Sequence, residues 1–129
     1  MFGLKNMGAI ASLMGRQDEL KAAAEQLGER IAELRVSGQA GGGACRVTVT
    51  GKMRVDRIDL EPAVCAGLGA SEDSRVQAQR LIAEATNDAI ERCQTQIQEM
   101  VQAEAKRLGL DGLLPKDGGL GSIGKFLGS

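Results

Sequence analysis

The feature that most constrains this chain is a leucine repeat with a seven-residue period near its start. The repeat and its companion apolar positions form the seam of an a/d heptad pattern, which predicts one long helix over residues 4–35. Residues 16–35 alone would span roughly 30 Å at about 1.5 Å per residue, which is too long to lie flat on a small core. The helix therefore needs a partner helix, from this chain or from a second copy. The candidate residues of this dimer or helix seam are Leu13, Leu20, Leu27, Ile31 and Leu34.

The charged residues of this helix are sorted around the seam. Arg16 and Arg30 fall at g positions, and Lys21 and Arg35 fall at e positions. All acids within residues 18–33 fall at b, c or f. One interpretation is an ordinary solvated helix with weak i,i+4 pairs. The other is a basic edge that flanks a pair of helices.

The segment from about residue 36 to 60 predicts three short antiparallel strands joined by glycine-containing turns. Residues 45–50 alternate apolar and polar side chains, which is typical of a half-buried strand. The apolar positions that follow change parity between Val55 and Ile58, which predicts a β-bulge near residues 56–57.

A second long helix is predicted over residues 72–108, with Ser71 as its N-cap and Gly109 just after its end. It is the more acidic of the two helices and the poorer candidate for contact with DNA. The Gly-rich remainder, residues 110–129, predicts a tail with little fixed structure. The expected fold is therefore α+β within one domain over residues 1–109: a long helix, a three-stranded antiparallel sheet and a second long helix.

The composition excludes several classes of protein. The 129 residues contain no His, Trp or Tyr, so the nucleophile pairs and metal sites that require histidine are absent. We therefore expect no enzyme, catalytic residue, metal, cofactor or small-molecule substrate. Cys45, Cys65 and Cys93 form no C-x-x-C motif and are interpreted as small buried apolar residues in a reducing, cytoplasmic setting. No apolar stretch approaches the roughly 20 residues of a membrane span, and no export signal is expected.

The ordered motifs of residues 1–108 resemble the YbaB/EbfC family of bacterial nucleoid-associated proteins. The sequence LRVSGQAG at 34–41 is similar to the family's V-x-G-x-x-G turn, VTVTG at 47–51 to its second strand, and VDRIDLEP at 55–62 to its third. The tripeptide Asn87-Asp88-Ala89 matches the family's N-D-A. The resemblance implies a homodimer with paired projecting helices that binds double-stranded DNA in the nucleoid and alters its conformation, with a possible influence on gene expression.

The resemblance supplies no agreed set of base-reading residues, so candidate phosphate contacts come from this sequence alone. The 16 basic residues are balanced by 17 acids, which gives a net charge of -1, so any basic surface must be local. Contacts of this type position DNA with little sequence specificity. The alternative is a dimeric interaction scaffold without significant DNA affinity, which the acidic second helix favours. The candidate DNA contacts are Arg16, Lys21, Arg30, Arg35, Arg46, Lys52, Arg54 and Arg57.

Overall fold

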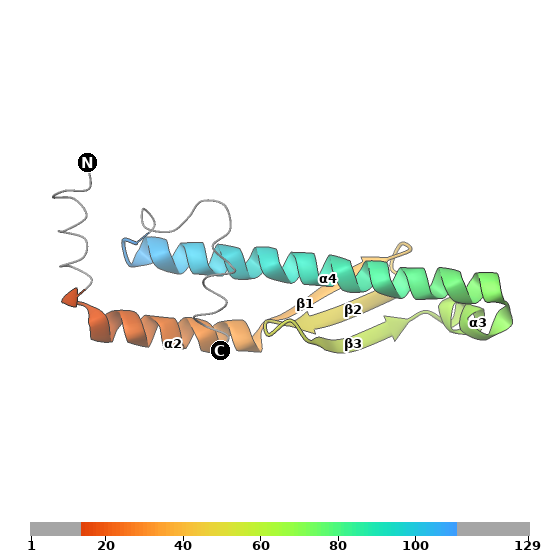
Figure 1. The fold of residues 1–129 in the computed structure, drawn as a ribbon, viewed down its shortest axis with the longest axis horizontal. Coiled ribbons are helices and arrows are strands. Elements are labelled where there is room, and N and C mark those ends of the chain that lie inside the picture. Colours follow the sequence, from red (N-terminus) through yellow and green to blue (C-terminus); the bar gives the residue numbers. More distant parts are fainter. Residues whose placement is uncertain (1–13, 111–129) are drawn as a thin grey trace. The chain divides into compact units, whose positions relative to one another are not determined.

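The computed structural model describes residues 14–110 and confirms the α+β architecture (Figure 1). A three-stranded antiparallel sheet with the order β1-β2-β3 follows the first described helix and precedes two more. The described residues divide into two compact units, one formed by residues 31–100 and the other by residues 14–30 with 101–110. No helix within residues 14–110 is long and apolar enough to cross a membrane. The elements in chain order are α2 (Gln17–Glu33), β1 (Arg35–Ala40), β2 (Cys45–Thr50), β3 (Val55–Leu60), α3 (Pro62–Ala70) and α4 (Glu72–Arg107).

The first helix is shorter than its heptad pattern predicts. A turn at Gly15 and Arg16 precedes α2, which begins only at Gln17, and glycine is a poor helix former. At the other end Arg35 is the first residue of β1, because its backbone pairs with Thr50 in the sheet. The prediction of one helix through residue 35 was therefore wrong at this end and at the turn. The remainder of the predicted helix, with Leu13, lies outside the described residues.

The sheet has one apolar and one polar face. Cys45, Val47 and Val49 of β2 are fully buried, whereas the residues between them point to the other face. The predicted bulge is confirmed, because Thr48 pairs with Arg57 while the next residue of β2 pairs with Val55. The residue between these partners, Asp56, is left unpaired in the ladder.

Helix α4 packs directly on the apolar face of β1 and β2. A side chain at Gly38 of β1 would overlap the backbone of Ala89, and Ala89 is fully buried. One residue away, the carboxylate of Asp88 accepts a hydrogen bond of 3.0 Å from the backbone N–H of Gln39. The thiol of Cys93 donates to the carbonyl oxygen of Thr50 in β2 at 3.4 Å. Small residues on both partners thus allow the helix to lie close to the strands.

The ends of α4 match the prediction, and α3 was missed. The hydroxyl oxygen of Ser71 accepts a 3.1 Å hydrogen bond from the N–H of Ser74, and Gly109 has a positive φ of 76° after the helix. Helix α3 fills a connection for which the sequence pattern predicted no element. It has no charged residue, and the only buried side chain in it is Val64. Its one sequence signal is Pro62 at the first helical position.

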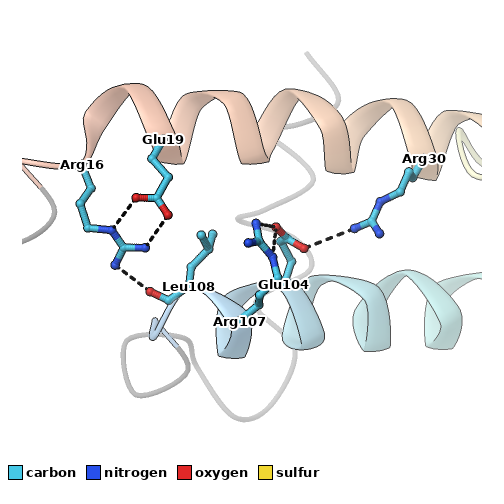
Figure 2. A network of polar contacts seen from close by, with 6 residues as sticks. All are labelled: Arg16, Glu19, Arg30, Glu104, Arg107 and Leu108. Carbon is cyan, nitrogen blue, oxygen red and sulfur yellow. Dashed lines mark hydrogen bonds and ion pairs between the residues drawn. The ribbon is translucent and has the colours of Figure 1, made fainter.

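In the unit formed by the two terminal segments, α2 lies beside the last turns of α4 (Figure 2). Ala23 and Leu27 are buried on α2, and Leu20 is half-buried. The partner helix that the seam required therefore comes from the same chain. In the sheet unit, Ile31 is buried and Leu34 is half-buried just before β1.

The close approach at Gly38 makes a sharp stability prediction. Replacement of Gly38 by Ala should destabilise the fold by about 1–3 kcal/mol, because the added methyl group overlaps the backbone of Ala89. The matched control is Gly28→Ala in α2, where no atom beyond the neighbouring backbone of the helix itself lies within 4 Å of the new methyl group. That variant should be about 0.5–1 kcal/mol more stable than wild type, since alanine is the better helix former. Urea unfolding measures both, and equal stability of the two variants would contradict the packing described here.

Candidate nucleic-acid interface

The eight basic candidates divide between the two units. Arg16, Lys21 and Arg30 belong to the unit of the terminal segments, and the other five belong to the sheet unit. The two groups differ in whether their side chains bind acids and carbonyl groups of the same chain. The five in the sheet unit are Arg35, Arg46, Lys52, Arg54 and Arg57.

Arg16 ties the start of α2 to the end of α4 (Figure 2). Its guanidinium donates two hydrogen bonds of 3.1 Å to the carboxylate of Glu19. A third, of 2.8 Å, goes from Nη1 to the backbone carbonyl of Leu108, one of the oxygens that a helix end leaves without an intrahelical partner. The bonds to Glu19 raise the pKa of Arg16 and lower that of Glu19. Arg16 is thus engaged within the chain.

Arg30 makes a second contact between the same helices. Its Nη2 lies 3.4 Å from Oε2 of Glu104, and the other carboxylate oxygen, Oε1, accepts a 3.0 Å hydrogen bond from Nε of Arg107. The hydrogen bond from Arg107 lowers the pKa of Glu104. The g positions of the heptad therefore face a partner helix of the same chain. Lys21 differs, because it is exposed and makes no ion pair with any residue between 14 and 110.

The strand arginines of the sheet unit, Arg35, Arg46 and Arg57, lie on the polar face of the sheet, away from α4. Arg46 alternates with the buried residues of β2, and Arg57 lies opposite Thr48 on the same face. Arg57 is paired with Asp59 at 2.9 Å, and Arg35 with Asp56 at 3.7 Å. These pairs are exposed and therefore weak, so both arginines can turn to a stronger anion. Arg46 has no ion-pair partner among the described residues.

The turn between β2 and β3 holds two more cations in a fixed backbone. The hydroxyl oxygen of Thr50 accepts hydrogen bonds from the N–H groups of Lys52 at 3.2 Å and Arg54 at 3.4 Å. Gly51 donates to the carbonyl of Leu34 at 3.1 Å, which anchors the turn to the start of β1. Lys52 and Arg54 are exposed, and neither forms an ion pair within residues 14–110. We call these two residues the basic turn.

Sequence reasoning found the cations of the basic turn but not the residue that organises them. Thr50 was interpreted only as a polar strand position. Its role follows from the polar side chain directly before Gly51, a pattern typical of turns in which a hydroxyl binds nearby backbone N–H groups.

A shallow groove beside β1 has mixed charge and is a poor phosphate site. Two arginines and three acids line it. One of the acids, Asp88, accepts a hydrogen bond from the backbone of β1. The hydrogen bond from Gln39 lowers the pKa of Asp88, so its negative charge is retained near neutral pH. The charged residues along the groove are Arg35, Asp88, Glu91, Arg92 and Glu99.

The cysteines offer no metal site or activated thiol. Cys45 and Cys93 are buried as predicted, and burial raises the pKa of both thiols. Cys65 is exposed on α3, so its interpretation as a buried residue was wrong. The reason is that α3 turns little of its surface inward. Between residues 14 and 110, no three Cys, Asp or Glu side chains are placed to hold a metal ion.

Residues 7–108 match the YbaB/EbfC DNA-binding family. The chain belongs to this family. The resemblance noted in the sequence is thereby confirmed, and the family is one of DNA-binding, nucleoid-associated proteins rather than enzymes. Two of its motifs meet in space here. Gly38 of the V-x-G-x-x-G turn packs on Ala89 of N-D-A, and Asp88 of N-D-A binds the backbone of Gln39.

The contact around Glu104 predicts a pH dependence of stability. Glu104→Gln should be less stable than wild type at pH 7, because the charge that Arg30 and Arg107 contact is lost. The pKa of Glu104 in the folded protein lies below its unfolded value of about 4.3, so its contribution is complete above that value and is lost as the pH falls through the folded pKa.

The difference between wild type and Glu104→Gln should therefore shrink as the pH falls below about 4. Thermal unfolding from pH 7 to pH 3 measures this. Glu99→Gln, on an exposed acid of the same helix, is the control and should track wild type. A difference that stays constant over this range would count against the described contact.

Proposed function

We propose that this member of the YbaB/EbfC family binds double-stranded DNA as a homodimer through phosphate contacts of its sheet unit. The observation that carries the proposal is the exposed basic set on this unit, three of whose members, Arg46, Lys52 and Arg54, have no ion-pair partner among the described residues. Arginine and lysine on a polar sheet face and a rigid turn suit phosphate oxygens.

Low sequence specificity follows from what surrounds these cations. Sequence readout requires side chains that reach base edges in a groove, and single-strand binding requires aromatic platforms for stacked bases. The sheet unit has no aromatic residue. On the polar face of the sheet the exposed strand residues are polar or charged, which supports contact with the DNA backbone.

The charge balance implies moderate affinity with strong salt dependence. The three cations Arg46, Lys52 and Arg54 of each subunit become six in a homodimer. If each neutralises one phosphate, the logarithm of the binding constant should fall against the logarithm of salt concentration with a slope of about -5. A protein that binds in this way coats or bends DNA irrespective of sequence, which fits a role in nucleoid organisation within the cytoplasm and an indirect influence on gene expression.

The test is charge reversal at the basic turn. Lys52→Glu with Arg54→Glu should weaken binding to every duplex by more than about tenfold at low salt and flatten the salt slope to about -2, because four of six phosphate contacts are lost in the dimer. The matched control is Arg75→Glu with Arg80→Glu, which changes the net charge equally on exposed positions of α4. Binding is measured by fluorescence anisotropy on two unrelated duplexes.

Equal loss in the two double variants would mean that only net charge matters, and the basic turn would not be the DNA contact. Wild-type protein that fails to bind duplex DNA at low salt would overturn the proposal in favour of an interaction scaffold. Circular dichroism of both variants establishes that each is folded.

A further inference from the structure

Strand β1 is an outer strand of the sheet, and part of its backbone faces away from β2 (Figure 1). Just before β1, the carbonyl of Leu34 accepts a 3.1 Å hydrogen bond from the turn that follows β2. Because N–H and C=O groups alternate in direction along a strand, those of Arg35, Ser37 and Gln39 point to the outer edge. The 3.0 Å hydrogen bond from Gln39 to Asp88 agrees with this direction, since Asp88 belongs to α4 and not to β2.

Asp88 closes only one end of this edge. It binds the N–H of Gln39, whereas the outward backbone groups of Arg35 and Ser37 form no hydrogen bond with any residue between 14 and 110. The groove beside β1 begins at these two residues, and α4 lines the rest of it. An open strand edge beside a groove is the arrangement that binds an extended peptide as an added strand.

The charges that line the groove leave an acidic surplus. Both arginines are paired, Arg92 with Asp88 at 3.0 Å and Arg35 at 3.7 Å with an acid of β3 that lies outside the groove. Glu91 and Glu99 are exposed and form no ion pair within the part of the chain that the structure describes. They are eight residues apart on α4, which places them about 12 Å apart along the helix axis. Two basic side chains at that spacing complement them.

The same two acids argue against other occupants of the edge. They repel phosphate groups. A two-fold axis normal to the sheet that joined β1 to β1 of a second copy would place both α4 helices on one face of the joined sheet. Glu91 and Glu99 of each copy would then face those of the other. A peptide with basic side chains meets neither difficulty.

We infer that the outer edge of β1 binds an extended, basic peptide segment of another protein, which adds a fourth strand to the sheet. In an antiparallel arrangement, the peptide residues opposite Arg35 and Ser37 exchange N–H···O hydrogen bonds with them. The hydrogen bond from Gln39 to Asp88 closes the edge beyond this point, so the edge holds about five peptide residues.

The alternation of a strand decides which peptide side chains meet α4. A peptide residue opposite the buried Val36 lies on the α4 face of the sheet, and so do the residues two positions before and after it. The outer two of these three residues are about 13 Å apart, so basic side chains there match the spacing of Glu91 and Glu99. The strand arginines lie on the opposite face, and the inference therefore does not depend on the DNA contact proposed above.

Backbone methylation of a synthetic peptide tests the strand pairing. The probe is a fluorescein-labelled peptide with the core Lys-Thr-Val-Thr-Lys, whose lysines and valine face α4 and whose threonines lie opposite Ser37 and Arg35. N-methylation of both threonines should weaken binding at least about tenfold, because their N–H groups donate to β1. N-methylation of both lysines is the matched control and should leave binding unchanged, since those N–H groups point away from β1. Fluorescence anisotropy with the full-length protein measures both.

Equal loss from the two methylated peptides would mean that the peptide does not pair along β1, and the inference would be wrong. Failure of wild-type protein to bind the unmodified peptide at concentrations up to about 1 mM would contradict it as well. Sedimentation distinguishes the remaining occupant: if added peptide released a second copy from the protein, that copy would be the partner of β1 instead.

Charge reversal on α4 tests the chemistry of the partner. Glu91→Lys with Glu99→Lys should weaken binding of the same peptide at least about tenfold and should favour a peptide with glutamate in place of both lysines. The matched control is Glu25→Lys with Glu29→Lys, which changes the net charge equally on exposed positions of α2. Circular dichroism establishes that both double variants are folded. An equal loss in the two would mean that only net charge attracts the peptide, which would overturn the assignment of the groove.

Discussion

The structure of the sheet unit depends on the close contact between α4 and β1. Gly38 has no side chain where the backbone of Ala89 passes, and the carboxylate of Asp88 binds the N–H of Gln39 beside it. This contact fixes which face of the sheet is buried, and hence that the arginines of the strands point to the other face. The same contact holds α4 against β1. Val55 and Ile58 of β3 are exposed in the subunit.

The sequence predicted the helices and strands whose apolar residues repeat with a regular spacing. It did not predict the features that depend on contacts with residues far away in the chain. The bulge at Asp56 and the Ser71 cap were predictable, because each is a local rule that the structure obeys. The heptad pattern predicted a first helix that ends too late. Arg35 fits the heptad spacing, but its backbone pairs with Thr50 of β2 instead. Helix α3 was missed because its short run of small residues has no amphipathic period. The heptad pattern placed Arg16 and Arg30 beside the apolar seam of the first helix. It could not show that the helix packed on this seam is α4 of the same chain.

The basic residues of the chain serve two different purposes, and only contacts distinguish them. Arg16 and Arg30 bind groups on α4, so their charges act within the terminal unit. Lys52 and Arg54 are held by backbone hydrogen bonds that leave both side chains in solvent. A net charge of -1 hides this difference, because it adds residues already neutralised by neighbours to those that are not. The candidate site is therefore a matter of local geometry rather than of composition.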